Sequence, residues 1–338
     1  MPEQKISILT ASLAVESRTA AIPEPSAKQV QIAVKSVGVC GSDIHYWEQG
    51  RIGPYVVEDD LILGHEASGV VTSVGSEVTR VAVGDRVAIE PGVPCGHCHE
   101  CRVGRYNLCP DVQFFATPPV NGAFAEYVVI DENFAHPVPD SMSFDEAALI
   151  EPLSVGVWAC KKANVAPGTR VLVTGAGPVG ILCAKVARAS GAVEVTLTDV
   201  NIERLKAAES MGFAVHKSGA DEPLPENSFT AVIECSGNVH AINTAIRAAA
   251  PASVVVLVGM AADGNVTVPV DVIQGRELWV TGTFRYAHTY PTAIGLVSSG
   301  AVVISDLVSA TYDLNSVEQA LGHAHKRPED LKVIVRVS

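Results

Sequence analysis

Hydrophobic and polar residues alternate over short stretches in the first part of the chain. Residues 30–39 follow this pattern, and residues 67–74 and 86–89 are short runs rich in β-branched side chains. Successive side chains of a strand point to opposite faces of a sheet, so these runs predict strands. Glycine-containing pairs between the runs supply turns. The part of the chain before residue 140 is therefore predicted to be rich in β-structure.

The pattern becomes helical near residue 143. Ser143 and Glu146 have the spacing of a capping box, which predicts a helix that continues through Ile150. Proline lacks the N–H group that a helix interior requires, so Pro152 is predicted to interrupt this helix. Residues 153–162 are predicted to resume it.

From Arg170 onward, short apolar runs alternate with longer helical ones. We predict strands at 171–174, 193–198, 230–234, 253–258 and 278–281, and helices at 179–189, 202–211 and 239–250. This alternation is typical of a parallel sheet with helices on both faces. The tail after about residue 286 is predicted to hold a helix, 315–322, and a final strand, 331–335.

Length and charge restrict the classes of protein that need to be considered. A chain of 338 residues suits two domains, and its 48% of hydrophobic residues are dispersed, as in a globular protein. The net charge of −13 argues against a nucleic-acid partner, which would require clustered Lys and Arg. The apolar stretch around 254–258 is far shorter than the ~20 residues of a membrane span. With no secretory signal in residues 1–10, we expect a soluble, cytoplasmic protein without a membrane partner.

A glycine-rich loop follows the predicted strand 171–174 and opens the next predicted helix. It reads Gly175-Ala176-Gly177-Pro178-Val179-Gly180, and an acid, Asp199, follows about 20 residues further on. Gly175 permits a tight turn, Gly177 lets the backbone approach a pyrophosphate, and Gly180 lets the helix pack on the strand. This context predicts dinucleotide binding, with the phosphates at the helix N-terminus.

Asp199 bears on the choice between NAD and NADP. Its carboxylate can accept hydrogen bonds from the adenosine ribose, whereas a ribose phosphate would face it as a like charge, at a cost of about 4 kcal/mol at ~4 Å. Arg204 is a counter-argument, because an arginine could bind that phosphate. We favour its interpretation as an exposed helix residue near the ribose, and therefore predict NAD as the cofactor.

Four of the eight cysteines form a tight group, Cys95, Cys98, Cys101 and Cys109. Glycine and proline between residues 92 and 104 argue against a continuous helix with a stripe of buried thiols. Four thiolates close a tetrahedral zinc with no open position, which predicts a structural site. His97 and His99 could substitute as ligands. The cysteines that remain outside both candidate metal sites are predicted to be inert core residues: Cys160, Cys183 and Cys235.

A second set of residues has the composition of a catalytic metal site. Cys40, His65 and Glu66 are separated along the chain, as in zinc sites that take three ligands from different loops and keep one position open. Each has an ordinary structural interpretation when taken singly, but Asp43, His45 and Glu151 accompany them. Asp43 is a candidate acceptor that orients His65.

These residues carry a resemblance to a known family. Gly64-His65-Glu66-Ala67-Ser68-Gly69 resembles the zinc signature of the medium-chain dehydrogenase/reductase superfamily. Cys40-Gly41-Ser42-Asp43, the four-cysteine segment and the nucleotide loop are similar to the same superfamily, in the same order. The segments that resemble its polyol branch (sorbitol, xylitol and arabinitol dehydrogenases) are Glu151-Pro152-Leu153-Ser154-Val155-Gly156, Phe284-Arg285-Tyr286, Tyr106-Asn107-Leu108 and residues 114–119.

The resemblance implies an α/β protein of two domains. Residues 1–150 and 286–338 would form a GroES-like β-barrel catalytic domain, and residues 151–285 a Rossmann domain with a doubly wound parallel sheet. It implies the reversible oxidation of a secondary alcohol of a polyol to the ketose, with hydride transfer to NAD. The expected metals are one catalytic and one structural Zn²⁺, and the expected assembly is a homotetramer.

The resemblance also implies roles for individual residues. Cys40, His65 and Glu66 would hold the catalytic zinc, and Glu151 would coordinate it directly or hydrogen-bond its water; which carboxylate coordinates stays open. Zinc can lower the pKa of water from 15.7 to about 7, so metal activation is expected to outweigh a general base. The proton is expected to leave through Glu151, Ser42 and His45. The expected substrate contacts are Tyr46, Phe114, Thr117, Glu151, Arg285 and Tyr286, and the expected further cofactor contacts are Val258, Gly259, Met260, Thr283, Phe284 and Arg285.

Three alternatives stay open at this point. One is another zinc dehydrogenase of the same superfamily that acts on simple alcohols, diols or threonine. Another is a non-catalytic nucleotide-binding relative, which the presence of Cys40, His65, Glu66 and Glu151 disfavours. The third is a zinc-dependent regulatory or nucleic-acid module, which the acidic charge disfavours.

Overall fold

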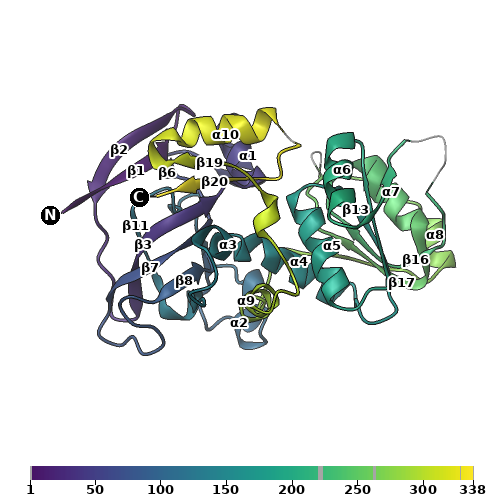
Figure 1. Cartoon of the computed structure of the whole chain (residues 1–338), viewed down its shortest axis with the longest axis horizontal. Helices are drawn as coiled ribbons and strands as arrows, with labels where there is room; N and C mark the ends of the chain where they lie inside the picture. The colour runs from purple at the N-terminus through teal and green to yellow at the C-terminus, as the bar shows by residue number, and fades with distance from the viewer. Residues whose placement is uncertain (1, 220–223, 262–263, 328, 338) are drawn as a thin grey trace. The chain divides into compact units, whose positions relative to one another are not determined.

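The chain forms two compact units in the computed structural model, which describes residues 2–219, 224–261, 264–327 and 329–337 (Figure 1). The first unit consists of residues 1–151 and 304–338, and the second of residues 152–303. The first boundary falls one residue from the predicted one. Residues 286–303, which the resemblance assigns to the catalytic domain, group with the second unit.

The first unit is built mainly from short strands. Their bounds are β1 (Glu3–Leu9), β2 (Val15–Ala21), β3 (Gln29–Gly38), β4 (Arg51–Ile52), β5 (Tyr55–Val56), β6 (Leu61–Ile62), β7 (Glu66–Val74), β8 (Arg86–Ile89), β9 (Gly92–Val93), β10 (Gln113–Phe114), β11 (Tyr127–Asp131), β12 (Ala135–Pro137), β19 (Val308–Asp313) and β20 (Lys332–Arg336). Its helices are α1 (Gly41–Gln49), α2 (His99–Arg102), α3 (Phe144–Ala148) and α10 (Val317–Lys326). Single 3₁₀ turns lie at Tyr106–Leu108, Glu132–Phe134, Ser305–Leu307 and Leu314–Ser316.

Two sheets enclose the core of this unit. One has the strand order β12-β8-β7-β3-β20-β19, with β11 also paired to β3, and the other has the order β2-β1-β6. The alternating residues of β3 place Val30, Ile32 and Val34 in the core, where each is at most 1% exposed. A bridge between Ile6 and Ala125 brings the two sheets together. Strand β20, from the end of the chain, lies beside β3 and completes the larger sheet.

The second unit is a parallel sheet with helices on both faces. Its strands are β13 (Arg170–Thr174), β14 (Glu194–Asp199), β15 (Ala214–Lys217), β16 (Phe229–Glu234), β17 (Ala249–Leu257) and β18 (Trp279–Gly282). Its helices are α5 (Pro178–Ala189), α6 (Ile202–Ser210), α7 (Val239–Ala248), α8 (Val270–Gly275) and α9 (Tyr290–Ser298), and α4 (Ile150–Lys162) begins at the boundary. The strand order is β15-β14-β13-β16-β17-β18, with every pair parallel.

Figure 1 shows α5 and α6 on one face of this sheet and α7 and α8 on the other. The predicted doubly wound architecture is thus confirmed. Because β13 lies between β14 and β16, the chain reverses direction across the sheet at the carboxyl end of β13. Ligands of open parallel sheets bind at such a point.

Three of the predicted helix boundaries are wrong. The break expected at Pro152 lies at Leu149, and Pro152 stands in the first turn of α4, where a missing N–H costs no intrahelical hydrogen bond. The helix predicted at 239–250 ends at Ala248, because Ala250 precedes Pro251 and the chain turns into β17. The helix predicted at 315–322 runs instead from Val317 to Lys326.

Among the described residues, no helix combines the length and the apolar character needed to cross a membrane.

Candidate active site and metal centres

Three residues from separate segments of the first unit converge on one point. Cys40 caps the N-terminus of α1, His65 precedes β7, and Glu66 is the first residue of β7. One ligand atom of each lies within 4.8 Å of the others. Gly64 makes this approach possible, because its φ is +85° and a Cβ there would lie 2.9 Å from Val37. The structure therefore brings together the three residues that the sequence suggested as zinc ligands.

A buried carboxylate connects two of the three segments. Asp43 is fully buried, and its Oδ2 accepts the backbone N–H of Cys40 at 2.9 Å. Its Oδ1 accepts the N–H of Gly64 at 2.9 Å and lies 3.8 Å from Nδ1 of His65. Asp43 thus holds the backbone on both sides of the site and faces the imidazole that the sequence analysis expected it to orient.

Glu66 is held from two sides. It pairs with Gly38 across the β3–β7 ladder, and a Cβ at Gly38 would lie 2.1 Å from Glu66 Oε2. Nζ of Lys332 lies 2.5 Å from both carboxylate oxygens, but the hydrogen bond that it donates goes to Oε1. Among the described residues, Oε2 is buried without a hydrogen-bond partner. A buried carboxylate beside a thiol and an imidazole fits a metal ligand.

The acidic groups around His65 favour the binding of a cation. Burial alone would lower the pKa of His65, but Cys40, Asp43 and Glu151 outweigh it and raise the pKa to about 10. A site that attracts a proton so strongly also suits a divalent cation, which would take the same place on the imidazole. The residues present therefore fit zinc.

The remaining residues expected near the metal differ in how deeply their side chains are buried. Glu151 is 6% exposed in the first turn of α4 and interacts electrostatically with His65 and Lys332. The ring of Phe114 lies 5.7 Å from that of His65. Tyr46 is buried in α1, where Ser42 is half-buried and His45 is exposed, and Thr117 is half-buried.

The four clustered cysteines also converge. Their sulfurs all lie within 4.8 Å of one another, with 3.4 Å between Cys98 and Cys101 and 4.0 Å between Cys95 and Cys101. Sulfurs of a tetrahedral zinc with bonds of about 2.3 Å are about 3.8 Å apart, so the spacing fits a closed Cys₄ site. Backbone N–H groups of His97 and Cys98 lower the pKa of Cys95 to about 6, which favours a thiolate there, whereas burial raises the pKa of Cys101 and of Cys109.

The glycine-rich loop follows β13, at the point where the strand order of the second unit's sheet reverses. Gly175 has φ +94°, and a Cβ at Gly180 would lie 1.8 Å from the carbonyl oxygen of Gly175. Only glycine fits at both positions. Gly177 caps α5, which begins at Pro178, so the N–H groups of Val179 and Gly180 stand at the free end of the helix. The loop has the geometry that the sequence predicted for a phosphate site.

Asp199 ends the neighbouring strand, β14, and supports the same loop. Its Oδ2 accepts the N–H of Ala176 at 2.7 Å, and its Oδ1 accepts the N–H of Asn201 at 2.8 Å. Arg204 lies 3.8 Å from Asp199 through its Nη1, and the same atom would be 3.6 Å from a Cβ at Gly177. Both residues considered for cofactor choice therefore lie beside the loop.

A buried acid that the sequence analysis missed organises the next loops. Glu234, at the end of β16, is fully buried and accepts N–H groups from Ser236 at 2.7 Å and Gly237 at 3.1 Å. Gly237 in turn packs on Gly259, where a Cβ would lie 2.2 Å from its nitrogen. The only local signal was an acid that ends an apolar strand before Ser-Gly.

The other expected cofactor contacts lie in the segments that come directly after β17 and β18. Val258, Gly259 and Met260 follow β17, and Thr283, which follows β18, donates its N–H to the carbonyl of Leu257 at 3.0 Å. Phe284 and Met260 are exposed. Arg285 has a positive φ of 53° and Tyr286 is buried in the second unit. Contact of these residues with the cofactor or with a substrate stays a prediction.

Comparison with known proteins extends these observations. Residues 26–140 match the family model of the alcohol dehydrogenase GroES-like domain, and residues 178–299 match that of the zinc-binding dehydrogenases. The chain is 40% identical over 340 residues to a sorbitol dehydrogenase of Bacillus subtilis, with 98% of this chain and 96% of the relative covered. It is 41% identical to a D-xylulose reductase A of Aspergillus oryzae, with 91% and 89% covered.

A solved structure agrees over the full length. It is an oxidoreductase/dehydrogenase of unknown specificity from Escherichia coli, 34% identical, with a TM-score of 0.93 and 100% of both chains covered. The resemblance noted in the sequence is confirmed, as is the GroES-like and Rossmann architecture. The chain belongs to the zinc-dependent medium-chain dehydrogenases, in the branch of the sorbitol dehydrogenases and D-xylulose reductases.

Proposed function

We propose that this chain catalyses the reversible oxidation of a secondary alcohol of a polyol, such as sorbitol or xylitol, to the ketose, with NAD as hydride acceptor. The observation that carries the proposal is the convergence of Cys40, His65 and Glu66, whose ligand atoms lie within 4.8 Å of one another. The relatives named for sorbitol and for D-xylulose support the substrate class, since reducing a ketose at its carbonyl carbon gives a polyol.

In this proposal Cys40, His65 and Glu66 hold the catalytic zinc. When bound, zinc supplies Lewis acidity that lowers the pKa of the substrate hydroxyl, and NAD supplies the hydride acceptor. The four clustered cysteines hold a structural zinc. Asp43 fixes the loops that carry Cys40 and His65. Phe114 and Tyr46 shape the pocket on the apolar side.

The protein's own groups would remove the proton. Glu151 is buried near His65 and supplies an acceptor close to the metal position. Ser42 and His45 are three residues apart on α1 and so lie on one face of the helix. Because Ser42 is half-buried and His45 exposed, the pair could pass a proton from the site to solvent.

A substrate panel tests the proposal. Purified enzyme with NAD should form NADH fastest with sorbitol or xylitol, and more slowly with butanediol, threonine and ethanol. Highest turnover with threonine or a simple diol would instead assign the chain to another zinc dehydrogenase. No NADH with any alcohol, in protein that binds NAD and zinc, would indicate a non-catalytic relative.

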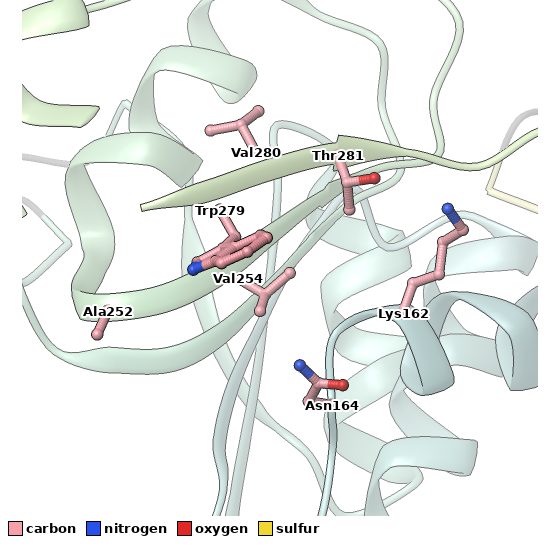
Figure 2. A pocket seen from close by; sticks show the side chains of 7 residues that line it. All are labelled: Lys162, Asn164, Ala252, Val254, Trp279, Val280 and Thr281. Carbon is pink, nitrogen blue, oxygen red and sulfur yellow. The ribbon is translucent and has the colours of Figure 1, made fainter. Parts of the chain in front are cut away.

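We also propose a homotetramer, in which β18 provides one interface. Among the described residues, β18 pairs only with β17, so its outer edge is open. Trp279 on this strand is 73% exposed, beside a groove lined by Lys162, Asn164, Ala252, Val254, Trp279, Val280 and Thr281 (Figure 2). An exposed apolar edge suits antiparallel pairing with a second copy about a twofold axis. Trp279→Glu should lower the mass measured by light scattering; an unchanged mass would exclude this edge.

The absence of disulfides among the eight cysteines is consistent with a reducing compartment. All eight are free thiols, and seven of them lie within the described metal clusters or in the buried core of the second unit. We therefore propose a cytoplasmic location.

We also propose that the two compact units are separate domains.

A further inference from the structure

A buried lysine that the proposed mechanism does not use lies behind the metal site. Lys332 is the first residue of β20 and is only 4% exposed. Its Nζ donates a hydrogen bond to the carbonyl of Val39 at 2.8 Å and another to Oε1 of Glu66 at 2.5 Å. Val39 immediately precedes Cys40. One ammonium group from the end of the chain therefore contacts two of the segments that carry the proposed ligands.

The surroundings explain why a lysine tolerates burial there. Burial opposes its charge, but the carboxylates of Glu66 and Glu151 and the sulfur of Cys40 interact with the ammonium and offset that cost. Cys40, Asp43, Glu66 and Glu151 can each be negative, whereas a divalent metal would offset only two such charges. A buried positive group stabilises this arrangement only if it is paired, as Lys332 is.

The contacts also restrict the Glu66 carboxylate. Nζ of Lys332 lies 2.5 Å from both carboxylate oxygens, and the absence of a side chain at Gly38 leaves room for Oε2 on the other side. Without the lysine, the carboxylate could rotate and either oxygen could face the site. With it, the ammonium fixes the position of both oxygens relative to the segment of Cys40.

We infer that Lys332 is a positioning residue of the metal site, which orients Glu66 for zinc and ties it to the segment of Cys40. The inference rests on the ligand set proposed above. It complements Asp43, which joins the segments of Cys40 and His65. Two buried groups of opposite charge thus link the three ligand segments in pairs.

Zinc retention tests this role without relying on turnover. Zinc per chain of Lys332→Met is measured in the folded protein against increasing concentrations of a chelator, with the structural site as an internal reference. We expect the zinc at the Cys40–His65–Glu66 site to be bound about 10–100-fold more weakly than in the wild type, which is the usual effect of losing a hydrogen-bond partner of a metal ligand. The absorption spectrum of the Co²⁺-loaded variant should also change. Unchanged or tighter zinc binding would overturn the inference.

Arg336→Met is the matched control. Arg336 lies on the same strand, but its side chain is 61% exposed and pairs with Asp145, away from Glu66. Loss of this charge should leave zinc retention unchanged. An equal loss in Lys332→Met and Arg336→Met would mean that removing any charge from β20 loosens the site, and would contradict a specific role of Lys332.

A double-mutant cycle separates positioning from a general structural role. If Lys332 acts through Glu66, then Lys332→Met should weaken zinc binding little further once Glu66→Gln is present. A full additional loss in that background would contradict the inference. If Glu66→Gln alone leaves zinc retention unchanged, the proposed ligand set is wrong. If Glu66→Gln weakens it and Lys332→Met does not, the ligand set stands and the positioning role fails.

Discussion

Glu66 and Gly38 face each other across two paired strands so closely that a Cβ at position 38 would lie 2.1 Å from the Glu66 carboxylate. The same position would be 3.2 Å from Cβ of Glu66. The glycine is therefore required by the ligand opposite, and not by its own backbone, since it is absent from the residues with positive φ.

Gly38→Ala should displace the Glu66 side chain from the metal position. We expect zinc at the catalytic site to be held about 10–100-fold more weakly, with a similar loss of turnover, because the carboxylate can no longer lie over the strand. Zinc per chain and NADH formation measure the two effects. Gly41→Ala serves as the control, since a Cβ there meets no atom within 4 Å. Normal zinc content in Gly38→Ala would show that Glu66 is not a ligand.

The four-cysteine segment should be separable from catalysis. Cys98→Ser removes one of four sulfurs that would close the structural site, so zinc per chain should fall by about one and the unfolding temperature should fall by several degrees. Turnover of the protein that stays folded should be close to normal. Cys160→Ser, at a buried thiol outside both clusters, should retain all its zinc. Lost activity in fully folded Cys98→Ser would contradict the structural assignment.

Local patterns predicted much of this fold. Alternation over 30–39 identified β3, and the glycine spacing before Gly180 identified the turn into α5, because both depend on neighbouring residues. Pro152 was misjudged because proline interrupts a helix interior but is tolerated in a first turn, and the sequence does not show which turn it occupies. The edge strand β15 and the helix α1 had too few apolar residues to stand out.

The residues that were missed at the site act over long range. Lys332 is 266 residues from Glu66 along the chain, and a lysine that begins a strand is ordinarily exposed. Only the pairing of β20 with β3 brings its side chain to the metal ligands. Cys40, His65 and Glu66 could be proposed from the sequence because metal binding requires specific residue types. The groups that orient them have no such signature.

Asp199 should control the choice between NAD and NADP. Asp199→Asn retains an acceptor for the N–H of Ala176 but removes the charge that opposes a ribose phosphate. We expect the wild type to use NADP at less than about a tenth of its NAD activity, and the variant to narrow that gap by roughly tenfold, ~1.4 kcal/mol. Values of kcat/KM with both cofactors measure this.

Glu203→Gln is the control for cofactor choice. Its exposed carboxylate pairs with Lys206 at 2.9 Å on the surface of α6, so the NAD preference should not change. Equal use of both cofactors by the wild type would contradict the predicted NAD preference and would favour Arg204, 3.8 Å from Asp199, as a phosphate ligand.

Glu132 should make the first unit sensitive to acid. Its carboxylate accepts the N–H groups of Thr79 and Arg80, both at 2.7 Å, and these bonds hold its pKa below the ordinary value of 4.5. A lowered pKa means that the folded state binds the proton less tightly than the unfolded state. The stabilisation is therefore fully present above about pH 4.5 and is lost as the pH falls through the folded pKa.

Glu132→Gln should consequently unfold at lower denaturant concentration than the wild type at pH 7, and the two midpoints should converge as the medium is acidified. Glu77→Gln, at an exposed carboxylate that lies 3.9 Å from Lys28, should match the wild type throughout, because exposed ion pairs contribute little. A difference between Glu132→Gln and the wild type that persisted undiminished in acid would mean that the side chain stabilises the loop by packing. Its two hydrogen bonds would then contribute nothing that depends on charge.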